Sequence, residues 1–577
     1  MMKKDRGLYL ICLFLILTTN SSYNQILGYQ TQYKFSLENV TTSRDWESLS
    51  LIHSDKYHTP EELIQELENI NTTAPGIIDL FSIGNSIEGR EILCVRITNE
   101  NNTSRKPGTL IIAQHHAREQ ITVEMALRFI IHLANGYGMV DAISDLIDTQ
   151  QIFVIPTLNP DGLHYVLGNK TFPGNPWLRK NARKIDDDGD GFFDEDSPDD
   201  LNKDGLISKY EMYVKSGNAW KYAQTYWEGN DTDNDGKTNE DPFGGVDLNR
   251  NYPYRWNDST LDSGWGSDST LMDYPGTVPF SEPETAALKK FLEERSFATA
   301  MSLHSGTNQT YFPWASTGVW INHGLYTSIY TDLRGSLPSN FFSYINDGYS
   351  VGYTIAGDWA DWMYSEKTCL VPMTFEIYHN KSVDSLEKIV EQTDYHVVYR
   401  FEEIFGYFNP IEAYIASLWE DLRSSFEYWL TLTPRLRLTG YSAIGGNLTG
   451  ESLRISLTIR NLSPRISTIE RLSIVDEDYD KVKGFMGSDI NFAALDGFST
   501  QELTFQILLK EDLPPDRNLT FRIGNRFVGY STFIVLGEKV IISTSTSFGD
   551  IWACILLPIA ILIKRKLRPK ELRNSNS

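Results

Sequence analysis

Three short apolar segments, each leading into a residue that can bind a metal, constrain the fold of this 577-residue chain most strongly. Residues 109–113 are β-branched and apolar and follow Pro107-Gly108, so they predict a buried strand. Residues 121–133 then space their apolar side chains as a helix does, and residues 298–303 and 369–375 predict two further strands. Open α/β sheets bind ligands at the carboxyl ends of their strands, so the residues that follow these segments are candidates for a site.

The first strand leads into two neighbouring histidines, His115 and His116. Neighbouring residues point in different directions where a strand ends, so we expect only one of them to reach a given metal. His116 lies three residues before Glu119, a spacing that brings an imidazole and a carboxylate to one side of a turn, whereas His115 has no such partner. A single His-x-x-Glu motif also begins ordinary helices, so a metal site requires a third ligand.

The other two predicted strands supply the missing residues, His304 and Glu376. Taken singly, each is a polar residue where a strand reaches the surface. Two histidines and one carboxylate with an open fourth position form the ligand set of a catalytic zinc site, and a further glutamate can act as the base in hydrolysis. We therefore expect His116, Glu119 and His304 to bind zinc and Glu376 to accept a proton.

Five motifs resemble, in order, the zinc metallocarboxypeptidases of the carboxypeptidase A, B and T group. They are His116-Ala-Arg118-Glu119, Asn159-Pro-Asp-Gly162, residues 245–251, His304-Ser305 and Thr374-Phe375-Glu376. Residues 352–364 are most similar to bacterial carboxypeptidase T. The resemblance covers about residues 57–410 and implies an α/β fold with a mixed eight-stranded sheet flanked by helices, one zinc ion and hydrolysis of the C-terminal peptide bond.

The resemblance also implies how a substrate is held. The carboxylate of a chain end requires a fixed cation that can bind it bidentately, and Arg250, helped by Asn249, fills that role. Tyr353 closes over the substrate.

A further arginine should stabilise the oxyanion, and Arg118 should line the neighbouring subsite. Residues 177–183 match the family's arginine region but carry one extra residue, so we choose Arg183 and keep Arg179 in reserve. Any one of these arginines, taken alone, is equally well explained as a solvated surface charge.

The residues near Tyr353 predict the specificity. Ala360 stands where relatives that release lysine and arginine carry an acidic residue, and a buried ammonium without a charge partner is costly. Ala360 and Thr374 instead predict a roomy neutral pocket. Asp358 matches the aspartate of carboxypeptidase T, whose relatives accept apolar and basic ends, or it caps a helix over residues 359–364. We expect apolar C-terminal residues to be preferred and Lys or Arg to be tolerated.

An acidic insertion, residues 186–241, departs from the family's minimal pattern. Its middle part has the register of an EF-hand loop, and its two ends repeat the first half of that loop. The candidate ligands are Asp200, Asn202, Asp204 and Glu211 in the middle, with Ser208 in the same register, and Asp186, Asp188, Asp190, Asp231, Asp233 and Asp235 at the ends. A run of aspartates is usually a solvated face, but three such repeats favour structural calcium, because packed carboxylates repel one another without it.

The rest of the chain predicts how the protein is organised. Residues 1–22 have a basic start and an apolar centre, which predicts a secretory signal peptide rather than the alternative, a core helix. Residues 23–56 form a short N-terminal segment, too short for the usual inhibitory pro-domain, so activation by its removal is not expected. The catalytic domain spans 57–430, and alternating strands over 435–545 predict an accessory β-sandwich.

Residues 548–563 predict a single-pass transmembrane anchor and residues 564–577 a basic cytoplasmic tail, with a last core helix as the alternative. Glycosylation acceptors recur at Asn39, Asn71, Asn101, Asn169, Asn308, Asn447, Asn461 and Asn518. We therefore expect the N-terminal domains on the extracellular face of the membrane, or a secreted protein if the last segment does not span. Cys94 and Cys369 are expected to be buried free thiols.

A formal net charge of −24 argues against nucleic acid as a partner. Peptide or protein C-termini are the expected substrates, and the oligomeric state stays open. Two alternatives stand beside the peptidase: an inactive adhesion protein on the same scaffold, whose mark would be a missing ligand or base, and a hydrolase of cell-wall peptides. None of the expected ligands is missing.

Overall fold

The computed structural model describes residues 46–536. The exceptions are 55, 102–105, 169–173, 188, 195, 204–206, 233, 235–243, 318–322, 338–344, 347–352, 368, 381–387, 402–403, 446–449, 451, 464–470, 475–481, 487–494, 497–498, 511–517 and 526–528. The predicted signal peptide, anchor and cytoplasmic tail fall outside the described residues. Within the described part, no helix has both the length and the apolar character needed to cross a membrane.

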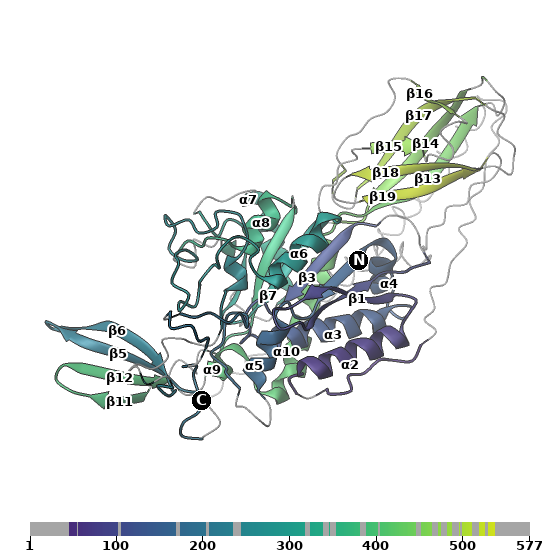
Figure 1. The fold of residues 1–577 in the computed structure, drawn as a ribbon. Helices are drawn as coiled ribbons and strands as arrows, with labels where there is room; N and C mark the ends of the chain where they lie inside the picture. Colours follow the sequence, from purple (N-terminus) through teal and green to yellow (C-terminus); the bar gives the residue numbers. More distant parts are fainter. Residues whose placement is uncertain are drawn as a thin grey trace, which may run out of the picture.

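An eight-stranded mixed sheet forms the centre of the molecule, as predicted (Figure 1). Its order is β1 (Ile78–Asn85), β2 (Glu91–Ile97), β4 (Gln151–Ile155), β3 (Gly108–Ala113), β7 (Phe297–His304), β10 (Val371–Ile377), β8 (Asn308–Tyr311) and β9 (Ile345–Asn346). The middle strands β4, β3, β7 and β10 run parallel to one another. The three segments that the sequence marked as strands are β3, β7 and β10, side by side.

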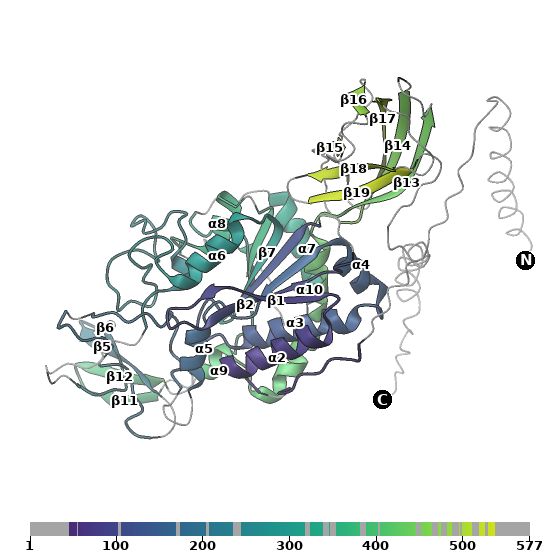
Figure 2. The same cartoon turned by 45° about the vertical axis from the view of Figure 1, so that its right-hand side comes forward.

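Both faces of this sheet are buried, which explains the nearly continuous apolar sequence of its central strands. Successive side chains alternate between the faces: Ile111 packs into one core cluster and its neighbours Leu110 and Ile112 into the other. The cluster around Ile111 includes α2 (Pro60–Thr73), α3 (Ile121–Gly136), α4 (Asp141–Thr149), α7 (His323–Ser336) and α10 (Ile415–Thr431). The opposite cluster includes α6 (Pro283–Glu293) and α8 (Trp359–Ser365), on the other side of the sheet in Figure 2.

Short elements complete the catalytic region. They are α5 (Pro160–Leu167), α9 (Ile404–Phe408) and the 3-10 turns η1 (Leu248–Arg250) and η4 (Glu412–Tyr414). Cys94 and Cys369 are buried free thiols, as expected.

A separate four-stranded antiparallel sheet, which the sequence did not predict, is built from two distant segments. Its order is β11 (Lys388–Gln392), β12 (His396–Phe401), β5 (Lys209–Ser216) and β6 (Ala219–Trp227). In Figures 1 and 2 it projects away from the main sheet. The hairpin β5–β6 comes from the acidic insertion.

This hairpin corrects the predicted EF-hand register. Glu211 lies inside β5, where its carboxylate pairs with Lys209 and accepts a hydrogen bond from Tyr213 Oη at 2.9 Å. An EF-hand loop leads into a helix and turns its last glutamate toward the ion, so Glu211 does not have that role. Ser208 is buried and its backbone amide donates to Glu228.

Residues 436–536 form two antiparallel sheets. One contains β13 (Leu436–Gly445), β14 (Ser452–Asn461), β17 (Thr500–Leu509) and β16 (Val482–Met486), and the other contains β15 (Arg471–Ile474), β18 (Asn518–Asn525) and β19 (Gly529–Leu536). That they make a separate accessory sandwich domain stays a prediction. Among the acceptor motifs, Asn461 is not accessible to a sugar in this fold, because its side chain is buried and Nδ2 donates to the carbonyls of Leu495 and Asp496.

Candidate metal centre

The strand register brings the predicted metal ligands to one edge of the main sheet. Ala113 in β3 is paired with Leu303 in β7, so His116 and Glu119, which follow β3, emerge beside His304 at the end of β7. Parallel strands share the edge at which their carboxyl ends lie, which explains why residues almost 190 positions apart converge.

His116, Glu119 and His304 form a compact donor cluster. His116 Nδ1 lies 2.7 Å from Glu119 Oε1, and His304 Nδ1 lies 3.0 Å from Glu119 Oε2 and 3.1 Å from His116 Nδ1. All three residues are buried. Two donor atoms at about 2.0–2.1 Å from a tetrahedral zinc are separated by about 3.3 Å, so the cluster fits zinc after small adjustments.

The protonation states also suit a metal. Burial alone would raise the pKa of Glu119, but His116 and His304 hold it well below its ordinary value. Burial lowers the pKa of His304. An ionised carboxylate beside a neutral imidazole is the form in which both residues bind zinc.

His115 is not part of the cluster. Its Nε2 lies 2.9 Å from Tyr252 Oη and its Nδ1 lies 2.9 Å from Ser302 Oγ. Both ring nitrogens are thus occupied inside the core, and His116 is the histidine of the pair that faces the candidate metal, as expected.

Asp247 is a site residue that the sequence analysis did not single out. Its Oδ1 lies 3.3 Å from His116 Nε2, and its Oδ2 accepts from Arg179 Nε at 2.9 Å. Burial would raise the pKa of Asp247, but Arg179 and Arg250 hold it well below its ordinary value. A carboxylate on the outer nitrogen keeps a proton there and leaves Nδ1 free for a metal. Asp247 lies within the motif 245–251, which could have drawn attention to it.

Glu376 lies in β10 directly beside His304, its register partner in β7. Its Oε2 accepts from the backbone amide of Thr307 at 3.4 Å. Burial, helped by the charge of Glu119, raises the pKa of Glu376 to about 8. The structure therefore holds a carboxyl group with a high proton affinity next to the donor cluster.

A hollow of about 700 Å³, here called the main pocket, opens over this cluster. The residues that line it include His116, Arg179, Asn249, Arg250, His304, Tyr353, Asp358, Ala360, Thr374 and Glu376, with Thr307, Tyr311, Phe312, Ala315 and Ile355 between them. Most of the residues predicted for zinc binding, catalysis or substrate binding thus share one cavity.

Arg183 is not in the main pocket, which corrects its choice as the oxyanion arginine. Its Nε donates to Glu282 Oε2 at 2.7 Å and its Nη2 donates to the carbonyl of Ser281. The reserve residue, Arg179, lines the main pocket instead and is held by Asp247. The extra residue in the segment 177–183 shifted the sequence alignment.

Arg250 is fixed at the wall of the main pocket. Its Nη1 donates to the carbonyl of Asn249 at 2.9 Å. Gly264 packs against its side chain: a Cβ there would lie 2.5 Å from Arg250 Cδ, and the φ of +83° also favours glycine. The guanidinium is therefore held in one place, as recognition of a carboxylate requires.

Asp358 caps α8, as one of the two predictions held, and it also lines the main pocket, where its role in specificity stays a prediction. Its Oδ2 accepts from the backbone amides of Ala360 and Asp361 at 2.9 and 3.1 Å, which makes it the N-cap of α8. Its Oδ1 accepts from Asn249 Nδ2 at 3.2 Å, and the residue lines the main pocket. Burial raises the pKa of Asp358.

Tyr353 lies at the solvent-exposed edge of the main pocket, and Arg118 lies outside its lining. Tyr353 is 40% exposed and lines the main pocket. The Arg118 guanidinium lies 4.3 Å above the ring of Phe408 and is not among the residues that line the cavity.

The acidic insertion shows no comparable donor cluster among its described residues. Asp186 accepts from the amides of Gly189 and Gly191, Asp190 accepts from the amide of Phe192, and the amide of Asn202 donates to Glu228. Asp200 and Asp231 are described but join no such cluster. Asp188, Asp204, Asp233 and Asp235 lie outside the described residues.

Comparison with known families gives one extended match, the model described as zinc carboxypeptidase, over residues 63–425. The chain is 36% identical over 128 residues to a "Zinc carboxypeptidase" of Saccharothrix mutabilis subsp. capreolus, covering 22% of this chain and 29% of that one. It is 24% identical over 349 residues to "Zinc carboxypeptidase A 1" of Drosophila melanogaster, covering 59% and 63%. The chain thus spans less than two thirds of the length of these relatives.

Similar solved structures include thrombin-activatable fibrinolysis inhibitor, with 18% identity, a TM-score of 0.48 and coverage of 66% of this chain and 75% of that one. Carboxypeptidase A from Helicoverpa armigera has 20% identity, a TM-score of 0.44 and coverage of 65% and 72%.

Proposed function

The chain belongs to the zinc carboxypeptidase family, and from this premise we propose that it is a zinc metallocarboxypeptidase that removes the C-terminal residue of peptides or proteins. The observation that carries the proposal is the buried cluster of His116, Glu119 and His304 beside Glu376, at a pocket that also contains Arg250. These groups supply a metal site, a base and an anchor for a chain end in one cavity.

Zinc, when bound, supplies a Lewis acid that polarises a carbonyl and acidifies water. Glu376 takes the proton of the attacking water on its carboxylate and passes it to the leaving amine. A cation held by the three ligands also stabilises the ionised form of Glu376, which offsets the effect of burial on its pKa. Asp247 holds the ring of His116 in the orientation that presents Nδ1.

Three arginines bind the substrate or stabilise the charge that develops on it. Arg250, with Asn249, binds the terminal carboxylate, and its fixed guanidinium suits a bidentate contact. Arg179 donates to the oxygen on which charge develops, since it lies between Asp247 and the main pocket. Tyr353, at the exposed margin, covers the substrate, and Arg118 serves the neighbouring subsite.

The pocket favours apolar C-terminal residues and accepts basic ones. Ala360 and Thr374 leave room for a large side chain. Asp358 also lines this pocket, but its hydrogen bonds to Asn249 and to α8 occupy much of its carboxylate. Lys or Arg is therefore a secondary substrate class.

The catalytic region works outside the cell, on the surface of the membrane or as a secreted protein. The support is the sequence of residues 1–22 and 548–563 and the acceptor asparagines other than Asn461. The sheets of residues 436–536 act as an accessory domain that separates the catalytic region from the membrane.

Structural calcium in the acidic insertion belongs to the same proposal. Its support is the threefold aspartate repeat and the environment of Asp194, where burial raises the pKa to about 6. A buried carboxylate of this kind is easier to keep ionised beside a cation. The EF-hand geometry is not part of the proposal, because Glu211 faces Lys209.

The test combines metal analysis with hydrolysis of a blocked dipeptide that ends in phenylalanine. The wild type should contain one zinc per chain and release the C-terminal residue. Glu376→Gln should keep the zinc and lose about 10²–10⁴-fold in kcat, as the loss of a base in water activation predicts. Glu420→Gln, on the exposed part of α10, is the matched control and should stay active. A zinc-loaded wild type that releases no C-terminal residue from any peptide would favour the inactive adhesion protein.

A further inference from the structure

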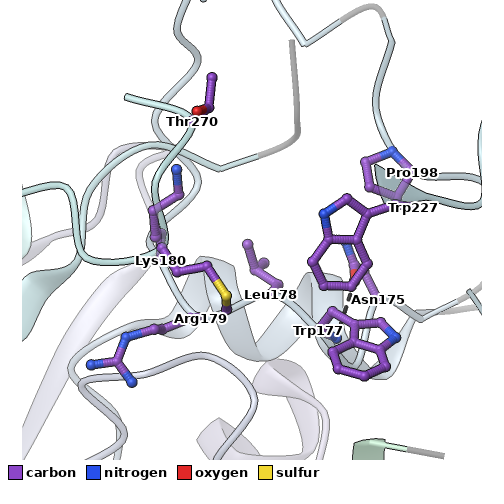
Figure 3. A pocket seen from close by; sticks show the side chains of 9 residues that line it. Asn175, Trp177, Leu178, Arg179, Lys180, Pro198, Trp227 and Thr270 are labelled. Atoms are coloured by element: carbon purple, nitrogen blue, oxygen red, sulfur yellow. Dashed lines mark hydrogen bonds between the residues drawn. The ribbon is translucent and has the colours of Figure 1, made fainter. Parts of the chain in front are cut away.

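A second hollow, of about 410 Å³ and partly open to solvent, lies beside the main pocket. We call it the aromatic hollow and define it by Trp177, Leu178, Pro198, Trp227, Met272 and Arg179. Figure 3 shows the two indoles close together on one side and Arg179 on the other.

The acidic insertion builds one wall of the aromatic hollow. Pro198 and Trp227 belong to the insertion, whereas Trp177 precedes it. The indoles of Trp177 and Trp227 pack edge to face with centroids 5.0 Å apart, and Trp177 Nε1 donates to the carbonyl of Ile207 at 2.6 Å. This contact ties the insertion to the segment that carries Arg179. The insertion therefore supplies Pro198 and Trp227 to a hollow whose other lining residues lie outside it.

Arg179 connects the two cavities, because it lines both. In Figure 3 its guanidinium points away from the indoles, and its Nε is held by Asp247 beside His116. Arg250 and Ala360 also line the main pocket and mark where the C-terminal residue binds. In a longer substrate, the residues before the cleaved bond extend from the metal cluster past Arg179. On that side they run toward the aromatic hollow. Since Arg179 lines both cavities and an extended peptide advances about 3.3–3.6 Å per residue, the residues a few positions before the cleaved bond are the candidates for the aromatic hollow.

The chemistry of the aromatic hollow selects the side chain. Its walls are mainly aromatic and aliphatic. Of the two lysines at its edge, Lys180 donates from Nζ to the carbonyl of Ser269, and Lys209, which pairs with Glu211, lies with Nζ 5.5 Å from the ring of Trp177. A lysine of the substrate would lose hydration between these walls, whereas an aromatic ring gains edge-to-face contacts.

We propose that the aromatic hollow binds an aromatic or large aliphatic side chain of the substrate, about two to four residues before the cleaved bond, so that the insertion selects substrates by sequence upstream of their C-terminus. This inference rests on the proposed carboxypeptidase function. It assigns Trp227 and Trp177 as specificity-determining residues.

The test uses glycine-rich peptides that share a C-terminal phenylalanine. One residue at the second, third or fourth position before the cleaved bond is changed to Phe, Lys or Gly, and a blocked dipeptide serves as the reference. At the position that reaches the aromatic hollow, Phe should raise kcat/KM about tenfold over Gly, the scale at which a filled apolar subsite discriminates, and Lys should lower it.

Two tryptophans of β6 provide a matched pair of variants. Trp227 lines the aromatic hollow, whereas Trp220 is 40% exposed and does not. Trp227→Ala should reduce the preference for Phe over Gly to about unity, while Trp220→Ala should keep the wild-type ratio. The readout is a ratio between substrates, so a change in the amount of active enzyme does not affect it.

The outcomes separate this inference from the function on which it rests. A wild type that hydrolyses neither the blocked dipeptide nor any longer peptide removes the proposed function. A wild type that hydrolyses them all, with no preference at any of the three positions, leaves the function standing and overturns the inference. A preference that Trp227→Ala retains also overturns it. If Trp227→Ala does not fold, the comparison of Phe with Lys on the wild type decides alone.

Discussion

Asp247 Oδ1 lies 3.3 Å from Nε2 of His116, on the opposite side of the imidazole from Glu119. At this distance the carboxylate favours a proton on Nε2 of His116, which leaves Nδ1 available to a metal. Its second oxygen holds Arg179, so one buried side chain orients both a zinc ligand and the proposed oxyanion donor.

Asp247→Asn should therefore weaken zinc binding without removing a ligand. The amide keeps the shape of the carboxylate but loses its charge, and we expect the zinc dissociation constant to rise about 10–100-fold. Competition with a chromogenic chelator measures this change. Asp421→Asn, an exposed position on α10, should leave the dissociation constant unchanged. Equal affinities for the wild type and Asp247→Asn would contradict the role given to this contact.

The two candidate arginines can be separated by charge-preserving variants. Arg179→Lys should lower kcat for the blocked dipeptide about 10²–10³-fold, because a lysine cannot keep the Asp247 contact and also donate to the oxyanion. Arg183→Lys loses only the contacts to Glu282 and Ser281 and should stay within about threefold of the wild type. The reverse order of effects would restore Arg183 as the oxyanion residue.

His58 predicts a pH dependence of stability that is separate from the metal centre. The residue is buried, with Nδ1 2.9 Å from Glu124 Oε2 and Nε2 3.4 Å from Glu66 Oε1. Burial alone would lower the pKa of His58, but the hydrogen bond and charge of Glu124, with Glu66, raise it above 6.5. The folded state thus binds this proton more tightly than the unfolded state.

The stability from His58 is fully present below the unfolded pKa of 6.5 and is lost as the pH rises through the raised folded value. At pH 6, His58→Gln should lower the free energy of unfolding by on the order of 3 kcal/mol, because the buried Glu124 loses its cationic partner and keeps the backbone amide of residue 58. The difference in the free energy of unfolding between the wild type and His58→Gln should become smaller as the pH rises. Urea unfolding of both proteins from pH 5.5 to 8.5 tests this, and a difference that does not vary with pH would refute it.

Removal of calcium should loosen the acidic insertion. EGTA is expected to lower the melting temperature or to increase protease cleavage between residues 186 and 241, since the aspartates repel one another without a cation. Added calcium should reverse the effect, and magnesium at the same concentration is the control. An unchanged melting profile, together with no bound calcium in metal analysis, would remove calcium from the proposal.

Asp358→Asn should shift specificity rather than abolish activity. Asparagine can still cap α8, so the fold should persist while the charge is lost from the pocket. We expect kcat/KM for C-terminal Lys or Arg to fall about tenfold relative to Phe, as the loss of one charge partner predicts. A panel of blocked peptides that differ only in the last residue measures the ratio. An unchanged ratio, or a preference for C-terminal Glu, would count against the role of Asp358.

Sequence reasoning located the metal centre because the signals are local. His116, His304 and Glu376 each follow or end a short apolar strand, and such strands are visible without any knowledge of tertiary contacts. The eight-stranded sheet came from the resemblance of the motifs. The distinction between His115 and His116 came from the spacing to Glu119.

The missed features depend on long-range contacts. Arg179 donates to Asp247, which lies 68 residues later in the chain, whereas Arg183 donates to Glu282, which lies 99 residues later. These distant partners determine which of the two arginines reaches the main pocket. Glu211 matched a loop pattern, but β5 pairs with β6 on one side and with β12 on the other, which places this residue in a strand. The hairpin with β6 is local, whereas no local pattern encodes the pairing with β12, because that segment lies almost two hundred residues later in the chain.

The composite sheet has a consequence for how the chain reaches its native state. The hairpin β5–β6 forms within one segment, but β12 joins β5 only across a long stretch of chain that contains β7 and β10. The main sheet has the same requirement, because Ala113 of β3 pairs with Leu303 of β7 across a comparable length of chain. Closing loops of this length costs entropy, and neither pairing is closer in sequence than the other. The metal ligands and the wall that carries Trp227 therefore both depend on strands from the second half of the catalytic region, and a chain that ended before β7 would lack both.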